Sequence, residues 1–369
     1  MVNQWKRATT TTLGLIGLII AIPPNSVFAA SNAWVERYKI NGDFRYRYEY
    51  FDEEGQPQSR HRNRLRLRLG IQAQVNDKVN VGMMLASGGE DPVSTNQSLD
   101  SQASTKDIRL DQGYFTFKPL DGLKIKGGKF KNPFYVPVKS ELIWDVDIRP
   151  EGLVLQYDRD QIFTNLGFFY VEERSKEDDT LLFGGQVGYK TKVNDVKVTG
   201  GTSYFTYTNI EGYALDDFDY LKAEGDSFGN TLDDEDRFIT EYQLWEVFGD
   251  VTIKMGGMPI TLFGDYVINT AADEQDTGYT AGIKIGQTKN PGSWDFRYLY
   301  QKIEDDAVFG TFSDSDFVGG GTSGRGHEYN FGYQIAKGWK LAVSYFNNNK
   351  NLHNEHDYER AMVDLKFKF

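Results

Sequence analysis

The clearest structural signal in the chain is residues 64–75, which read Arg-Leu-Arg-Leu-Arg-Leu-Gly-Ile-Gln-Ala-Gln-Val. Every odd-numbered position is aliphatic, whereas the even-numbered positions hold three arginines, one glycine and two glutamines. A helix would spread the arginines around its circumference, but a strand places alternate residues on opposite faces. The stretch therefore predicts a strand with one apolar face and one basic face.

The same alternation occurs near both ends of the chain. Residues 40–50 alternate apolar and aromatic residues with polar and charged ones, and residues 361–369 alternate Ala, Val, Leu, Phe and Phe with Met, Asp and two lysines. Soluble antiparallel sheets also alternate when one face packs on a core. The number and spacing of the strands must therefore distinguish a soluble sheet from a membrane barrel.

We count sixteen candidate strands outside the first thirty residues. They cover residues 34–51, 61–75, 79–87, 106–118, 123–131, 152–158, 161–173, 180–193, 196–210, 238–255, 259–270, 277–288, 293–306, 327–336, 338–349 and 358–369. A tilted strand crosses the hydrocarbon layer with about 9–11 residues. Most of these strands are long enough to do so.

The connections between the strands alternate in length. Short connections such as 76–78, 159–160, 194–195 and 337–338 are rich in turn-forming residues, whereas the long ones, at 88–105, 132–151, 211–237 and 307–326, are rich in acidic residues. Outer-membrane barrels have short turns on one rim and long loops on the other, and closure leaves no unpaired sheet edge in lipid. We predict a transmembrane antiparallel up-and-down β-barrel of sixteen strands that forms one domain over residues 30–369.

Composition excludes several other classes of protein. The 369 residues contain no cysteine, 25% are charged, and the net charge is −12. Disulfides and thiolate metal sites are excluded, and the acidic balance argues against binding to nucleic acid. We expect no nucleic-acid partner.

The first 29 residues predict an export signal. Lys6 and Arg7 precede an apolar run from Leu13 to Ile22, and Val27 and Ala29 supply small residues before a cleavage site. This arrangement is typical of a cleaved secretory signal peptide. We expect the chain to leave the cytoplasm without residues 1–29.

No catalytic or metal-binding motif stands out. The four histidines are His61, His327, His353 and His356, and neither a nucleophile elbow nor a phosphate-binding glycine loop is present. His353 and His356 would share a metal only if a helical turn brought them together. We predict that the protein is not an enzyme and has no cofactor and no metal site.

Three stretches resemble the outer-membrane porins of Gram-negative bacteria. They are residues 128–134 (Gly-Lys-Phe-Lys-Asn-Pro-Phe), 144–152 (Trp-Asp-Val-Asp-Ile-Arg-Pro-Glu-Gly) and 312–317 (Phe-Ser-Asp-Ser-Asp-Phe). The terminal Phe369, with its alternating apolar partners, is similar to the signal read by the barrel-assembly machinery. The resemblance implies a general-porin-like barrel in the bacterial outer membrane, in contact with lipid and lipopolysaccharide, and a homotrimer.

Charged residues on the predicted inner face indicate a water-filled channel. An arginine facing lipid near the bilayer midplane costs about 2–4 kcal/mol, so the basic face must point into the lumen. The residues that we expect to line the pore on this wall are Arg45, Arg47, Arg62, Arg64, Arg66, Arg68, Lys124 and Lys126.

The connection 132–151 is expected to fold into the barrel. Pro133, Pro137 and Pro150 stiffen it, and the apolar residues 142–144 would be out of place on a free surface loop. In the porins that the sequence resembles, this position carries the loop that narrows the pore. Its acidic residues, Glu141, Asp145 and Asp147, would then face the arginines across a constriction and create a transverse field.

We therefore predict a porin for passive diffusion of small hydrophilic solutes and ions. Two alternatives stay open from the sequence. One is a channel selective for an anion or a sugar, and the other is a non-conducting barrel that serves adhesion or envelope anchoring.

Overall fold

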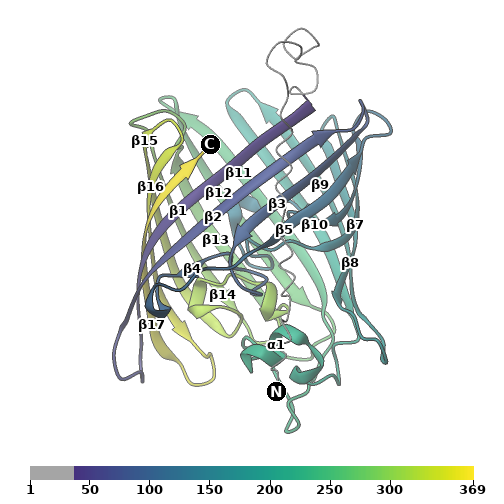
Figure 1. The fold of residues 1–369 in the computed structure, drawn as a ribbon, viewed down its shortest axis with the longest axis vertical. Coiled ribbons are helices and arrows are strands. Elements are labelled where there is room, and N and C mark those ends of the chain that lie inside the picture. The colour runs from purple at the N-terminus through teal and green to yellow at the C-terminus, as the bar shows by residue number, and fades with distance from the viewer. Residues whose placement is uncertain (1–36) are drawn as a thin grey trace, which may run out of the picture. The chain divides into compact units, whose positions relative to one another are not determined.

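The alternating segments form one closed antiparallel barrel in the computed structural model (Figure 1). The structure describes residues 37–369, so the predicted signal peptide, residues 1–29, lies outside the described residues. Seventeen strands are present in the described part of the chain. One of them, β4 (Gln97–Ser98), pairs only with β2, which leaves sixteen strands in the wall, as predicted.

The wall strands match the predicted segments closely. They are β1 (Tyr38–Glu53), β2 (Arg60–Gln74), β3 (Val79–Ser87), β5 (Ile108–Phe117), β6 (Leu123–Lys129), β7 (Glu151–Arg159), β8 (Ile162–Glu172), β9 (Thr180–Val193), β10 (Val196–Thr208), β11 (Gln243–Met255), β12 (Met258–Asn269), β13 (Thr277–Gly286), β14 (Trp294–Ile303), β15 (Gly324–Ala336), β16 (Trp339–Lys350) and β17 (His356–Lys368). Pairing of β1 with β17 closes the barrel.

The burial pattern of β2 shows which face points outward. Leu69 is 49% exposed, whereas Arg66, on the other face, is 8% exposed. On the neighbouring strand β1, Arg45 and Arg47 are 6% and 5% exposed. The aliphatic residues therefore face outward and the arginines face the lumen, which is the phase that the cost of arginine in lipid requires.

The two rims of the barrel differ as predicted. Tight turns join strands at one end, and in two of them Asp160 and Asn194 adopt the left-handed conformation, with φ of 56° and 54°. Asp and Asn tolerate this conformation better than most residues. The long connections lie at the opposite end, where Figure 1 shows α1 (Asp219–Glu224).

Aromatic side chains on adjacent strands of the wall contact one another, and two of them, Tyr329 and Tyr345, are exposed. Tyr298, Tyr329 and Tyr345 form a row of ring contacts across β14, β15 and β16, with centroids 5.2 and 6.2 Å apart. Among residues 37–369, no helix is long and apolar enough to cross a membrane.

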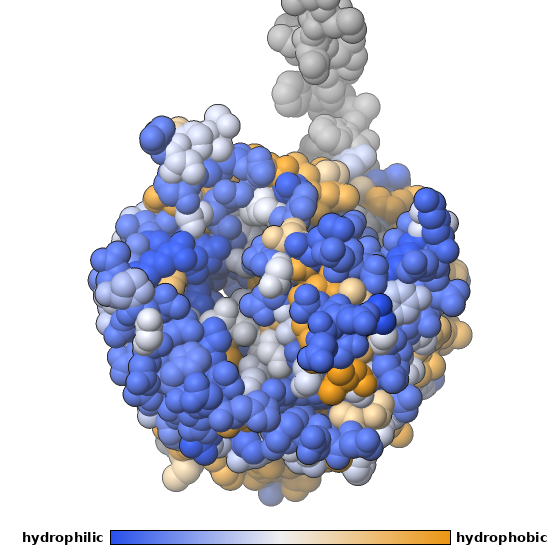
Figure 2. Space-filling view, turned by 90° about the horizontal axis from the view of Figure 1, so that it is seen from below, coloured by the Kyte–Doolittle hydropathy of each residue, from blue (hydrophilic) through white to orange (hydrophobic). Residues whose placement is uncertain are grey.

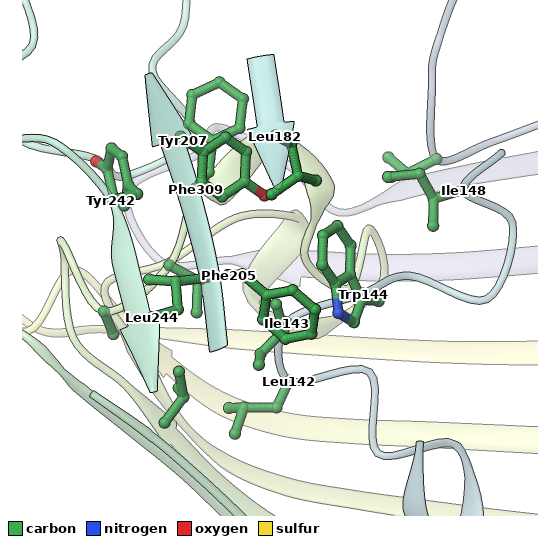
Figure 3. Close-up of a cluster of buried hydrophobic side chains, with 14 of the residues drawn as sticks. Leu142, Ile143, Trp144, Ile148, Leu182, Phe205, Tyr207, Tyr242, Leu244 and Phe309 are labelled. Atoms are coloured by element: carbon green, nitrogen blue, oxygen red, sulfur yellow. The ribbon is translucent and has the colours of Figure 1, made fainter. Parts of the chain in front are cut away.

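Long connections also fill part of the barrel interior with apolar side chains (Figure 3). Trp144 of the 132–151 segment packs against Phe205 of β10 at 5.1 Å between ring centroids. Phe309, from the connection between β14 and β15, packs against Tyr207 and Tyr242. The connections are therefore part of the fold rather than free surface loops.

Candidate functional site: the lumen and its constriction

The six arginines of β1 and β2 form one wall of the lumen, but they have different partners. Arg66 and Arg68 both pair with Asp43 of β1 and with Asp147 of the 132–151 segment. The two nitrogen–oxygen distances to Asp147 are 3.0 and 3.2 Å. This pair of guanidiniums is therefore matched by a pair of carboxylates.

A second group of guanidiniums surrounds Glu49, which is fully buried in the lumen wall. Arg47 and Arg64 approach its carboxylate at 3.3 and 3.6 Å, and Arg62 donates to it as well. Arg360 of β17 also lies 3.4 Å from this carboxylate. Sequence reasoning missed both Glu49 and Arg360 as members of the wall.

The 132–151 segment contacts widely separated strands. Asp147 pairs with β2 as described, Ser140 Oγ donates to Asp265 Oδ2 of β12 at 2.7 Å, and the Tyr135 N–H donates to Gln186 Oε1 of β9 at 2.7 Å. Arg297 of β14 donates to the Val138 carbonyl at 3.2 Å. These contacts lie on the lumen faces of four strands.

A second connection reaches the same region. The segment 304–323, between β14 and β15, is largely buried, although the sequence suggested one of several acidic loops at the rim. The Asp145 N–H donates to the Phe312 carbonyl at 2.8 Å, and Ser315 donates through its N–H and Oγ to Asp145 Oδ2 at 3.0 and 2.9 Å. Hydrogen bonds therefore join the two segments.

The 304–323 segment also brings a carboxylate to the arginine wall. Asp316 lies 2.7 Å from Arg360 and 3.5 Å from Arg47. The stretch 312–317 carried the sequence resemblance, but its place inside the barrel could not be deduced from alternation. Only its apolar residues, Phe312 and Phe317, gave a signal that it is not a free loop.

Acidic residues of the two segments gather at one point. Oxygen atoms of Glu141, Asp145 and Asp314 lie within 4.8 Å of one another. Burial, together with the neighbouring carboxylates, raises the pKa of Glu141 and of Asp314 well above the usual range, and raises the pKa of Asp145 to about 7. Burial and mutual repulsion therefore favour the protonated forms of these carboxyl groups.

Asp147 behaves in the opposite way. Burial disfavours its charged form, but Arg66 and Arg68 outweigh that effect and hold the pKa of Asp147 well below its usual range. Asp147 is therefore ionised at neutral pH, while the nearby Asp145 titrates.

Two cavities lie between the arginine wall and the 132–151 and 304–323 segments. The inner cavity, of about 280 Å³, is lined by Arg45, Arg47, Lys340 and Lys366 on the wall side and by Glu141, Asp145 and Asp147 on the segment side. The outer cavity, of about 350 Å³, is lined by Arg62, Arg64, Arg360 and Asp91. Val93, Ser315 and Asp316 line both cavities, so the two cavities are adjacent at these residues.

The outer cavity opens toward the long connections. Figure 2 views the molecule from that end and shows hydrophilic residues around a hollow, with hydrophobic residues inside the rim. The two predicted lysines lie elsewhere. Lys124 lines a groove at the short-turn rim, and Lys126 lies over the Tyr114 ring at 4.7 Å beside a separate small cavity.

The terminal residue is tied to the first strand. Backbone hydrogen bonds of 2.9 and 3.1 Å join Phe369 to Gly42, and the Phe369 side chain is largely exposed. The histidines of the last connection have partners within the protein. His353 contacts Asp305 at 3.0 Å, and His356 contacts Glu53 at 3.1 Å.

Comparison with known proteins identifies the family. Residues 53–241 and 250–369 match the model of a family described as "Putative porin". The chain belongs to this porin family. No curated protein sequence matches it.

Solved structures of porins share the barrel. The OprB structure of Pseudomonas putida has 13% sequence identity and a TM-score of 0.62, and the match covers 91% of this chain and 96% of OprB. A triple mutant of the Rhodopseudomonas blastica porin has 12% identity and a TM-score of 0.54, with 90% and 100% of the two chains covered. A loop-deleted OmpT of Vibrio cholerae has 10% identity and a TM-score of 0.52, and the match covers 90% of this chain and 100% of OmpT.

Family and fold together establish the general function. The protein is a bacterial outer-membrane porin, a channel for passive diffusion of small hydrophilic solutes. This confirms the general-porin-like fold, the outer-membrane location and the channel function that the sequence predicted.

Proposed function

We propose that solutes cross the constriction through the two adjacent cavities, between the arginine wall and the inward segments. The observation that carries this proposal is that Val93, Ser315 and Asp316 line both cavities. The permeation path would then be bounded by Arg45, Arg47, Arg62 and Arg64 on one side. The 132–151 segment would narrow it from the other side.

Opposite charges would face each other across this path. Arg45 and Arg47 line the inner cavity together with Asp145 and Asp147. A transverse field in a narrow, water-filled passage orients dipolar solutes and disfavours apolar ones. Arg66 and Arg68 would act indirectly, because they pair with Asp147 and thereby hold the segment in place.

Recording from planar lipid bilayers tests the proposal. Purified full-length protein should give stepwise conductance. Exchanging Arg45 for Glu should move the reversal potential, measured in a salt gradient, toward the equilibrium potential of the cation. A reversal potential that the Arg45→Glu exchange leaves unchanged would contradict the proposed path. Current that saturates with a sugar or an anion, rather than rising linearly, would favour a selective channel.

Three further partners are proposed from the family resemblance. We expect the barrel-assembly machinery to read the exposed Phe369, lipopolysaccharide to contact the outer surface, and three copies to associate. Replacing Phe369 with Ala should lower the folded amount in the outer membrane, measured by the heat-modifiable mobility of the barrel on gels. Chemical cross-linking in native membranes would show whether a trimer forms.

A further inference from the structure

Positive charge exceeds negative charge where the two cavities are adjacent. Five guanidiniums among the described residues cluster there, and the carboxylates within 4.0 Å of them number three. The guanidiniums are those of Arg45, Arg47, Arg62, Arg64 and Arg360, and the carboxylates are those of Glu49, Asp316 and Asp364. The excess is therefore 5 − 3 = 2 positive charges.

Nearby carboxylates are engaged elsewhere. Asp147 pairs with Arg66 and Arg68, and Asp91 accepts a hydrogen bond of 2.9 Å from the Val93 N–H of its own connection. Neither lies within 4.0 Å of the five guanidiniums in the part of the chain that the structure describes.

Arg45 carries the clearest sign of a missing partner. Its exposed fraction is 6%, and its side chain donates a hydrogen bond of 2.5 Å to the Asn96 Oδ1. Within residues 37–369 its Nε has no hydrogen-bond partner. The same holds for the Nε atoms of Arg64, Arg66 and Arg360, but Arg66 pairs with two carboxylates through its other nitrogens. Buried, unpaired guanidinium nitrogens are costly, so such a cluster favours an additional anionic partner.

Asp316 is the carboxylate of the cluster that belongs to an inward segment rather than to the wall. Glu49 lies on β1 and Asp364 on β17, whereas Asp316 projects from the 304–323 segment and its side chain keeps 25% of its exposure. It also lines both cavities. Its carboxylate therefore occupies the position where a permeating anion would meet Arg47 and Arg360.

We propose that this arginine cluster is a binding site for the oxyanion group of a solute, a carboxylate or a phosphate. Asp316 is its internal occupant, and a passing oxyanion competes with it for Arg47 and Arg360 while also using Arg45. A guanidinium offers a planar set of donors that matches two oxygens of one anion. The site therefore distinguishes oxyanions from chloride. This inference rests on the proposed permeation path.

Block of the channel current tests the site. Full-length protein in planar bilayers is titrated with inorganic phosphate and, separately, with acetate against a chloride background. Replacing Asp316 with Asn removes the competitor, so the half-blocking concentration should fall about tenfold, as expected for one charge-assisted interaction. Replacing Arg45 with Gln should raise it. The anion that blocks the current at the lower concentration identifies the preferred group, phosphate or carboxylate.

A matched control separates this effect from a general change in charge. Asp305 lies on the same segment and contacts His353, but it lines neither cavity. The Asp305→Asn variant should behave like the wild type. If the anion blocks half of the current at the same concentration in the wild type, Asp316→Asn and Asp305→Asn, the proposed binding site is refuted.

Calorimetry distinguishes failure of the site from failure of the path. Phosphate binding to the detergent-solubilised protein is measured by isothermal titration and needs no current. Tighter binding by Asp316→Asn than by Asp305→Asn supports the site even if the wild type gives no conductance, in which case only the permeation path is refuted. No difference in binding between the two variants refutes the site.

Discussion

Arg66 and Arg45 lie directly opposite each other on neighbouring strands and face the same lumen, yet their surroundings differ. Arg66 has two carboxylate partners, Asp43 and Asp147, whereas Arg45 donates to the neutral Asn96 and has no carboxylate within 4.0 Å among the described residues. A matched guanidinium holds a segment in place, and an unmatched one is available to a solute. The role of a lumen arginine therefore depends on which carboxylates reach it from other parts of the chain.

The largest expected effect comes from breaking the matched side. Replacing Asp147 with Asn leaves Arg66 and Arg68 with one carboxylate between them, and removing one partner of a buried ion pair costs about 3–5 kcal/mol. The free energy of unfolding, measured by denaturant titration in detergent, should fall by that order. Single-channel conductance should rise as the segment loosens. Unchanged values for both would contradict an anchoring role.

The effect of pH should be smaller per pH unit than the effect of Asp147→Asn. The folded state raises the pKa of Asp145 to about 7, so the folded protein binds a proton that the unfolded chain releases near its ordinary value. Stability from this group is present at low pH and is lost as pH rises toward 7, at about 1.4 kcal/mol per pH unit.

Cation selectivity should rise as the pH passes through about 7, because Asp145 lines the inner cavity and becomes charged there in the folded protein. The Asp145→Asn variant is the control, since its stability and its cation selectivity should both lose this dependence on pH. Glu141, Asp314, Asp147 and Asp316 are the acidic groups that surround Asp145. A pH profile that Asp145→Asn does not flatten would assign the titration to another of these groups.

The unmatched side should respond in the opposite sense. Replacing Arg45 with Gln removes a buried guanidinium that has no carboxylate within 4.0 Å among residues 37–369. The unfolding free energy should therefore not fall, because an unpaired buried charge is itself costly. The reversal potential in a salt gradient should nevertheless shift toward the equilibrium potential of the cation. Replacing Arg66 with Gln should instead lower stability more than selectivity. If the two variants behave alike, the distinction between the two groups fails.

The smallest effect is expected outside the lumen. Arg325 and Glu355 pair at 2.7 Å at the long-loop rim, where both side chains are partly exposed. Solvent screens such pairs, so Glu355→Gln should lower the unfolding free energy by less than about 1 kcal/mol. Conductance and selectivity should not change. A large loss would show that exposure is a poor guide to the strength of these pairs.

Prediction from the sequence succeeded where local pattern governs structure. The predicted strand 180–193 has the same bounds as β9, and the phase of Arg64, Arg66 and Arg68 is as expected. It was less accurate at 238–255, because β11 begins at Gln243. Phe238 and Tyr242 are buried in the apolar cluster, and the Tyr242 hydroxyl donates to Asp306 at 3.0 Å.

The strand pattern, the turn residues and the direction of each wall side chain follow from alternation and from the cost of arginine in lipid, and the sequence contains both. Tertiary structure alone decided that Asp147 meets Arg66, that Asp316 reaches Arg47 and Arg360, and that Arg45 is left without a carboxylate. The physical reason is distance along the chain. Arg47 and Asp364 are 317 positions apart, and they meet only because the barrel closes.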